Sequence, residues 1–299
     1  MMLKNFGQME QFVREQSGKK RVALAAAHDA DALGSLMMAV DRGIAEAILI
    51  GRRKEIVRVL DEMGKDAGDF RIIEEEDDRA AADKAVELVH CGEADMPMKG
   101  LMHTSTFMKA ILDKEKGLKE EGNLLSQASV FEIPEKDRFL IISDCAVNID
   151  PDLETKIKIT ENAAALAHTL GIEQPKIAVL SAVEVVNPKI RSTIDAAAMR
   201  ERLSDRYLID GPLALDNAID EAAAHHKGIE SPVAGNADIL IVPDLWSGNI
   251  FSKGLVFFAH LRSAGTLNGL KAPVVMSSRT DTVENKYLSI LTAVLQTIR

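Results

Sequence analysis

The residues best suited to chemistry lie near the C-terminus, where a strand-like run ends in Ser277-Ser278-Arg279. A helix is expected to begin within a few residues, so hydroxyls, a guanidinium and free helix N–H groups converge at one point. That combination is typical of a phosphate site. The same residues also fit an ordinary turn, with Asp281 as the helix N-cap and Arg279 as a solvated charge.

A second polar stretch begins at Gly100, which permits a close turn. Thr104-Ser105-Thr106 then offers hydroxyls and N–H groups at an expected helix start, and Lys109 follows about one turn along. Taken alone, this stretch is more simply interpreted as a Ser/Thr cap with one exposed lysine.

Two more stretches follow apolar, strand-like runs. Asp144 and Asn148 can orient a ligand, or they can satisfy backbone donors in a tight loop. Gly248 lets a ligand or a backbone come close, Asn249 can cap the next helix, and Trp246 is interpreted as a hydrophobic plug. Since a parallel α/β sheet binds ligands beyond the carboxyl ends of its strands, all these positions are candidates.

Several function classes are disfavoured. The sequence has no G-x-G-x-x-G after its first strand, no Walker A lysine loop and no G-x-S-x-G elbow. Cys91 and Cys145 lack metal-like spacing, so no metal site is expected. The net charge of −10 and the lack of a basic run argue against a nucleic-acid partner. With neither a signal peptide nor an apolar run long enough to span a bilayer, we expect a cytoplasmic protein without a membrane partner.

Short β-branched runs alternate with longer helical patterns along the 299 residues. The predicted strands are 21–27, 45–51, 70–73, 139–147, 176–181, 207–210, 237–243 and 272–278. The predicted helices are 29–42, 52–63, 78–90, 153–170, 190–203, 214–226, 249–261 and 281–298. This rhythm favours an α/β fold with parallel crossovers and helices on both sheet faces. Residues 114–138 are the best linker candidate.

Together these stretches closely resemble the phosphate acetyl/butyryltransferase family, and its shorter butyryltransferase branch most of all. The resemblance covers nearly the whole chain, in family order. The phrases that carry it are MKGLMHTSTFMKAILDKEKGL, FLIISDCAVNIDPDLETK, PKIAVLSAVEVVNPKI, GNADILIVPDLWSGNIFSKGL and PVVMSSRTDTVENK.

The resemblance implies two three-layer α/β domains around a cleft, akin to the isocitrate/isopropylmalate dehydrogenases. One domain would comprise residues 1–133 and 276–299, and the other 134–275. It also implies a homo-oligomer.

The implied reaction interconverts acyl-CoA plus phosphate with acyl phosphate plus coenzyme A, by direct transfer in a ternary complex. Coenzyme A is then a substrate, and no cofactor is tightly bound. Arg279 is expected to hold the phosphate charge and Ser278 to hydrogen-bond the reacting sulfur or carbonyl oxygen. The candidate substrate-binding residues are Thr104, Ser105, Thr106, Lys109, Asp144, Asn148, Gly248, Asn249 and Ser277.

The sequence departs from the family pattern at two places. Acetyltransferase relatives carry an aspartate, thought to deprotonate the thiol, where this chain has Asn285, so Asp281 or Glu284 would have to substitute. Relatives also carry an arginine on the helix where Lys109 is the nearest cation. His103 is interpreted as a packing residue.

Butyryl-CoA is the favoured acyl donor, and acetyl-CoA is the nearest alternative. A non-catalytic coenzyme A-binding relative is a third hypothesis, to which Asn285 gives substance. A metal-dependent dehydrogenase on the related fold is disfavoured because the sequence shows no aspartate cluster. The chain length, the general base, the oligomeric state and the physiological direction stay open.

Overall fold

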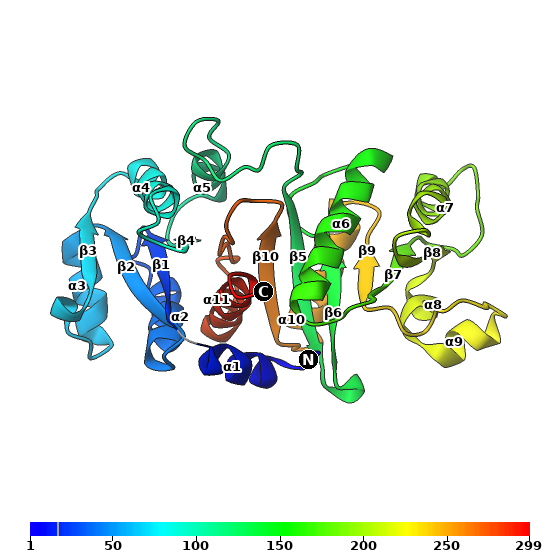
Figure 1. The fold of residues 1–299 in the computed structure, drawn as a ribbon, viewed down its shortest axis with the longest axis horizontal. Coiled ribbons are helices and arrows are strands. Elements are labelled where there is room, and N and C mark those ends of the chain that lie inside the picture. The colour runs from blue at the N-terminus through cyan, green and yellow to red at the C-terminus, as the bar shows by residue number, and fades with distance from the viewer. Residues whose placement is uncertain (17) are drawn as a thin grey trace. The chain divides into compact units, whose positions relative to one another are not determined.

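A computed structural model describes residues 1–16 and 18–299 as a mixed α/β structure with two sheets (Figure 1). The chain divides into two compact units. Unit 1 comprises Met1–Asn5 and Leu124–Ser263, and unit 2 comprises Phe6–Asn123 and Ala264–Arg299. The chain passes from one unit to the other at 123/124 and at 263/264. The family resemblance implied boundaries at 133/134 and 275/276, about ten residues later in each case. Among the described helices, none combines the length and apolar character that crossing a bilayer requires.

Unit 2 is built on a parallel sheet with the strand order β3-β2-β1-β4. Its strands are β1 (Lys20–Ala25), β2 (Ala45–Gly51), β3 (Arg71–Glu74) and β4 (Met96–Lys99). Its first helices are α1 (Phe6–Glu15), α2 (Ala30–Asp41), α3 (Arg53–Glu62), the 3₁₀ turn η1 (Ala67–Asp69), α4 (Asp78–His90) and α5 (Thr104–Ile111). The residues of β1 from Val22 to Ala25 are all buried, as expected for a central parallel strand.

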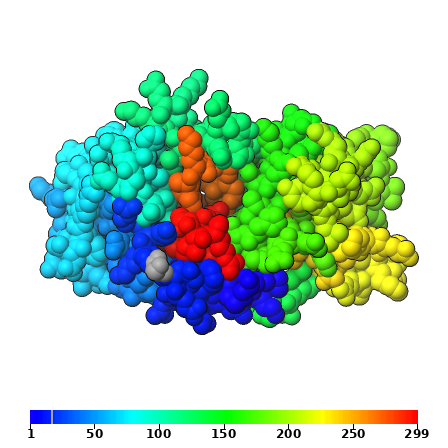
Figure 2. Space-filling model, viewed as in Figure 1, coloured from blue at the N-terminus to red at the C-terminus, as the bar shows by residue number. Residues whose placement is uncertain are grey.

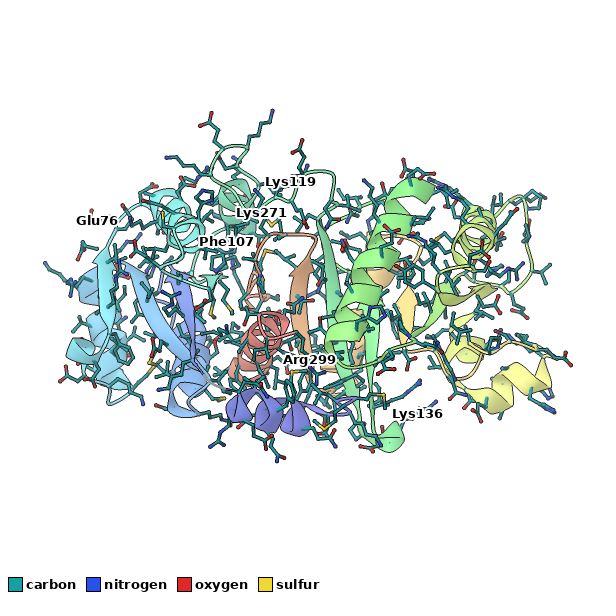
Figure 3. All side chains as sticks on the ribbon, in the orientation of Figure 1. Glu76, Phe107, Lys119, Lys136, Lys271 and Arg299 are labelled. Carbon is teal, nitrogen blue, oxygen red and sulfur yellow. The ribbon has the colours of Figure 1, made fainter. Side chains whose placement is uncertain are left out.

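The C-terminal segment completes unit 2. After β10 (Ser263–Asn268), Leu270 forms an antiparallel bridge with Lys119. Lys119 and the residue after Leu270, Lys271, are labelled in Figure 3. Val275 then pairs in parallel with Met98, which extends the sheet beyond β4. The last helix, α11 (Val283–Gln296), is buried from Asn285 to Leu295.

Helix α11 is fixed to α1 by specific contacts. The Tyr287 hydroxyl donates to Glu10 at 2.8 Å, and the Thr292 hydroxyl approaches the sulfur of Met9 at 3.7 Å. Figure 2 shows the surface of the C-terminal residues in red directly beside the blue surface of the N-terminal residues. Unit 2 therefore needs both of its chain segments.

Unit 1 has the strand order β5-β6-β9-β7-β8. Its strands are β5 (Ser126–Ile133), β6 (Arg138–Ser143), β7 (Lys176–Leu180), β8 (Leu208–Leu213) and β9 (Ile239–Ile241). Its helices are the 3₁₀ turn η2 (Pro134–Lys136), α6 (Leu153–Thr169), α7 (Arg191–Leu203), α8 (Leu215–Ile219), α9 (Glu221–His226) and α10 (Leu245–Phe257). β6, β9, β7 and β8 are parallel, whereas β5 is antiparallel to β6.

Three sequence predictions about elements are wrong. No strand forms over 272–278, where only Val274 and Val275 make single bridges, to Leu267 and Met98. The linker prediction for 114–138 includes β5, whose buried polar residues Gln127 and Ser129 hide the apolar pattern and are hydrogen-bonded to each other. The single helix expected over 214–226 is two helices, because Asp220 is extended and its side chain caps α9.

Phe107 anchors α5, because its side chain is fully buried in unit 2 (labelled in Figure 3). We expect Phe107→Ala to lower the free energy of unfolding by about 3–5 kcal/mol, since the ring leaves a cavity. Urea denaturation followed by circular dichroism measures this. Leu112→Ala, at the C-cap of the same helix and 37% exposed, serves as the control and should cost less, about 1–2 kcal/mol. Equal losses in the two variants would contradict the anchoring role.

Candidate functional site

The carboxyl edge of the unit 2 sheet brings two of the predicted stretches together. The N–H of Lys99 donates to the carbonyl of Val275, and the N–H of Val275 donates to Pro97, each at 3.0 Å. Both segments therefore leave the sheet at the same edge. There the guanidinium of Arg279 contacts Nδ1 of His103 at 3.2 Å, across 176 residues of sequence.

The Thr104-Ser105-Thr106 stretch forms the first turn of α5. The N-cap is His103, whose side chain makes no capping hydrogen bond. The Ser/Thr cap interpretation is therefore wrong, and the three hydroxyls stand beside the N–H groups of the first turn, which is a favourable place for an anion. Lys109 is exposed further along the helix.

His103 is exposed, so its interpretation as a packing residue is also wrong. Its contact with Arg279 gives His103 a positioning role, because the contact limits where the guanidinium can lie. No feature of the sequence indicated this pair, because the two residues come from separate stretches.

The loop that follows the Val275 bridge is closed by hydrogen bonds between its own polar groups. The N–H of Ser278 donates to the Asp281 carboxylate at 2.7 Å, and the hydroxyls of Ser278 and Thr280 lie 3.1 Å apart. Ser278 and Arg279 are exposed, whereas Ser277 is half-buried. The N-cap of α11 is Thr282, which accepts from the N–H of Asn285, so the expected cap at Asp281 is wrong by one residue.

The two candidate bases differ in their surroundings. The carboxylate of Asp281 is held by Ser278, next to the candidate site, whereas Glu284 is exposed in the first turn of α11. Asn285 is buried. A general-base role stays a prediction for Asp281 and for Glu284.

Two lysines at this edge were not predicted from the sequence. The buried ammonium of Lys99 donates to the carbonyl oxygens of Gly100 and Met102, and that of Lys286 donates to the carbonyl of Asp281. Burial lowers the pKa of Lys99, and the positive charges of Arg279 and Lys286 lower it further. The sequence did not indicate either residue, because Lys99 ends a strand and Lys286 lies inside an apolar helix, and neither belongs to a recognisable motif.

Gly100 is required where the loop after β4 crosses the end of β1. A Cβ at this position would lie 2.3 Å from the carbonyl oxygen of Ala26 and 2.6 Å from that of Ala25. The N–H of Gly100 donates to Ala25 at 2.8 Å. The close turn predicted for Gly100 is confirmed, and the space is filled by backbone.

The candidate residues of unit 1 form a second group. The buried carboxylate of Asp144 orders the loop after β6: it accepts from the side-chain amide of Asn148 and from the N–H groups of Gln127, Ala146, Val147 and Asn148. These contacts occupy the carboxylate. A ligand role for Asp144 and Asn148 stays a prediction.

Gly248 and Asn249 join α10 to the same loop. A Cβ on Gly248 would lie 2.6 Å from the carbonyl oxygen of Asp144, and the Asn249 amide donates to the carbonyl of Cys145 at 3.1 Å. The residue that caps α10 is Asp244, not Asn249. Trp246 is 58% exposed, so the plug interpretation is wrong.

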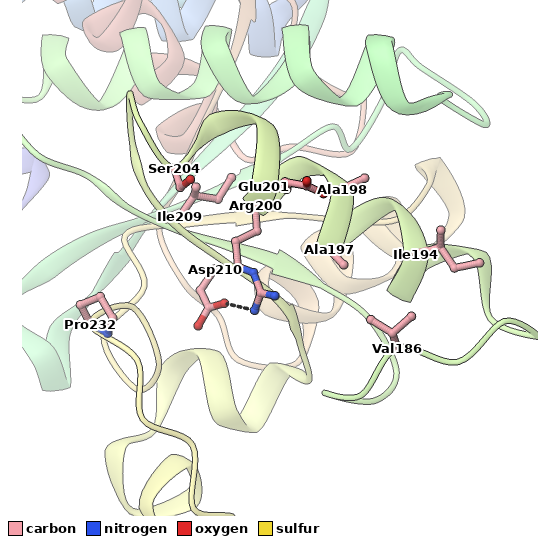
Figure 4. Close-up of a pocket in the computed structure, with 10 residues that line it drawn as sticks. All are labelled: Val186, Ile194, Ala197, Ala198, Arg200, Glu201, Ser204, Ile209, Asp210 and Pro232. Carbon is pink, nitrogen blue, oxygen red and sulfur yellow. Dashed lines mark hydrogen bonds and ion pairs between the residues drawn. The ribbon is translucent and has the colours of Figure 1, made fainter.

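Unit 1 also contains an open hollow of about 750 Å³ beside α7 and β8 (Figure 4). Its walls are largely apolar, and the guanidinium of Arg200 contacts Asp210 at 3.3 Å within it. None of the residues predicted for the site lines this hollow. It is therefore separate from the chemistry proposed below.

Neither cysteine is placed for catalysis or metal binding. Cys91 is exposed, and burial raises the pKa of the Cys145 thiol, as does the nearby Asp144 charge. Across residues 1–16 and 18–299, no three His, Cys, Asp or Glu side chains gather as a metal site would require.

Comparison with known proteins assigns the family. Residues 79–294 match the model of the phosphate acetyl/butaryl transferase family. The chain belongs to this family. It is 46% identical to a phosphate butyryltransferase of Clostridium acetobutylicum, with 98% of each chain covered. It is 42% identical to a phosphate acetyltransferase of Thermotoga maritima, covering 94% of this chain and 97% of that one.

A solved relative supports the same assignment. The crystal structure of a branched-chain phosphotransacylase from Enterococcus faecalis V583 matches with a TM-score of 0.83 and 34% identity, over 93% of this chain and 98% of that one. The family resemblance expected from the sequence is thereby confirmed.

The two glycines of α10 provide a test of the loop contact. We expect Gly248→Ala to lower the free energy of unfolding by about 1–3 kcal/mol, because its methyl group would overlap the Asp144 carbonyl. Gly254→Ala is the matched control, since its Cβ would meet nothing within 4 Å. The control should be neutral or up to about 1 kcal/mol more stable. Thermal unfolding of both variants measures the difference, and equal stabilities would refute the tight contact.

Proposed function

We propose that the protein is a phosphate acyltransferase that interconverts a short-chain acyl-CoA and phosphate with acyl phosphate and coenzyme A, with butyryl as the favoured acyl group. The observation that carries the proposal is the Arg279–His103 contact beside Ser278 and the start of α5. Family membership supports the same activity.

The reaction proceeds by direct transfer in a ternary complex. The coenzyme A thiolate attacks the carbonyl carbon of the acyl phosphate, the C–S bond forms, and the C–O bond to phosphate breaks as phosphate leaves with that electron pair. In reverse, a phosphate oxygen attacks the thioester and the thiolate leaves. Arg279 balances charge on the phosphate, and Ser278 donates to the reacting sulfur or to the developing oxyanion.

The thiol proton passes to a carboxylate, for which Asp281 is the better-placed group. Its carboxylate is held in the loop that carries Ser278, whereas Glu284 lies in the first turn of the following helix. The candidate substrate-binding residues of unit 2 are Thr104, Ser105, Thr106, Lys109 and Ser277. Those of unit 1 are Asp144, Asn148, Gly248 and Asn249.

Two alternatives have specific observations in their favour. The relatives include acetyltransferases at 42% identity, so acetyl-CoA is the competing donor. Asn285 favours a coenzyme A-binding relative without turnover, because an amide cannot accept the thiol proton. Coenzyme A is a substrate of either acyltransferase and only a ligand of the non-catalytic relative, and we propose no tightly bound cofactor.

We also propose a cytoplasmic location and a fold related to that of the isocitrate/isopropylmalate dehydrogenases. The exposed free thiol of Cys91 supports a reducing compartment. The parallel sheet of unit 2 and the mostly parallel sheet of unit 1 support the fold relationship.

A homo-oligomer is supported by α10, which has a single buried residue, Gly248. One side of the helix exposes Trp246, Ile250 and Phe257, interrupted by Lys253, and the C-cap residue Phe258 is exposed at the end of the helix. Large side chains at this exposure leave on the order of 500 Å² of apolar surface. A stable contact needs about 800 Å² from each partner, so the stripe can form the centre of a contact with a second copy.

The proposed activity is tested by free thiol release from butyryl-CoA with and without phosphate. We expect release only when phosphate is present. Arg279→Ala should lower kcat by about 10²–10³-fold, because charge on the phosphate loses its partner in the transition state. Arg58→Ala, which removes an exposed guanidinium paired with Glu62 on α3, is the control and should keep full activity.

Release that ignores phosphate would indicate a thioesterase instead. Binding of coenzyme A in a calorimeter without any turnover would indicate the non-catalytic alternative. Unchanged turnover in Arg279→Ala would remove the assignment of that residue.

The oligomer is tested by Ile250→Glu, whose charge would be buried in the contact. We expect the variant to elute as a monomer in size-exclusion chromatography with light scattering, while wild type elutes as a larger species. Val185→Glu is the control, because it places the same charge on an equally exposed valine outside α10. A monomeric wild type would overturn the proposal.

A further inference from the structure

Three lysines are buried in the described part of the chain, namely Lys99, Lys156 and Lys286. Lys156 has the partner that burial ordinarily requires, since its ammonium contacts the Asp195 carboxylate at 2.7 Å. Lys99 forms no ion pair in the described residues and donates only to carbonyl oxygens, at 3.2 Å to Gly100 and 3.4 Å to Met102. An ammonium that is buried without a carboxylate costs stability, so its position calls for a reason.

The two lysines at the sheet edge are attached to the two loops that carry the proposed phosphate site. Lys99 donates to Met102, the residue before His103, and His103 contacts Arg279. Lys286 donates to the carbonyl of Asp281, whose carboxylate accepts from the N–H of Ser278. The Lys99 ammonium therefore lies at the start of α5, and the Lys286 ammonium lies at the Ser278–Asp281 loop.

Two positively and two negatively charged side chains act on the Lys99 ammonium. Arg279 and Lys286 disfavour its protonated form, and only Asp29 and Asp281 oppose them. Burial lowers the pKa of Lys99 most of all. A doubly charged phosphate would supply the missing negative charge, in a chain whose net charge of −10 otherwise repels anions.

Lys99 also has a donor left for a ligand. An ammonium group carries three N–H bonds, and two of them go to carbonyl oxygens at long distances. A phosphoryl oxygen can take the third, or replace one of the carbonyls.

We propose that Lys99 is a further phosphate-binding residue, whose buried ammonium contacts a phosphoryl oxygen of the substrate while Lys286 adds positive charge beside it. This inference rests on the proposed function and adds a residue to its phosphate site. It predicts that Lys99 serves binding rather than stability, in contrast to Lys156.

The experiment is a titration of inorganic phosphate by calorimetry, on the protein alone and on the protein saturated with coenzyme A. We expect Lys99→Met to bind phosphate at least about tenfold more weakly than wild type, because a charge-assisted hydrogen bond is lost. Its melting temperature without phosphate should equal or exceed that of wild type, since an unpaired buried charge is removed. Lys99→Arg should keep part of the affinity.

Lys156→Met is the matched control, a second buried lysine that lies in unit 1. Its melting temperature should fall, because Asp195 loses its buried partner, while its phosphate affinity should be unchanged. Phosphate binding by Lys99→Met at wild-type strength would overturn the inference, and so would a wild type that binds no phosphate in either titration.

Turnover is measured separately on the same preparations. A wild type that releases thiol in a phosphate-dependent way, together with Lys99→Met of normal phosphate affinity, would leave the proposed function standing and remove Lys99 from the site. A wild type that binds phosphate through Lys99 but shows no acyltransferase turnover would confirm Lys99 as a phosphate-binding residue and refute the proposed function.

Discussion

The candidate site depends on one pair of backbone hydrogen bonds, between the end of β4 and the segment at Val275. These bonds bring together loops that are far apart in sequence, and the parallel direction makes both loops leave at the same edge. The Arg279–His103 contact joins the two loops beyond this bridge, and Lys99 holds one of them by donating to Met102. A shift of β4 by one residue against β1, with which Lys99 pairs at Ala25, would turn Lys99 to the opposite face of the sheet.

The site combines a rigid base with exposed reacting groups. Gly100 closes the loop after β4 against the carbonyls of Ala25 and Ala26, and the Asp281 carboxylate closes the loop that carries Ser278. Ser278 and Arg279 stay exposed above these contacts. Arg279 is therefore attached to backbone that packing holds in place. This lowers the entropy cost of ordering its side chain when an anion binds.

The parallel α/β character of the fold could be predicted from the sequence because strands buried on both faces are continuous apolar runs, as in β1 and β6. β5 was missed because its buried faces contain serine and glutamine, whose hydrogen bonds replace apolar contacts. The polar stretches could be singled out by their position after strands. Lys99, Lys286 and the contact of His103 could not, because burial and pairing across 176 residues are properties of the tertiary fold alone.

The division of the chain has a consequence for its synthesis. Neither unit is one continuous segment, since the chain passes from one to the other at 5/6, 123/124 and 263/264. A ribosome makes all of residues 124–263 before it delivers the segment at Val275 and the buried helix α11 to the sheet that residues 6–123 began. During that interval β4 is an unprotected sheet edge, so the nascent chain is exposed to wrong strand pairing until its last residues emerge.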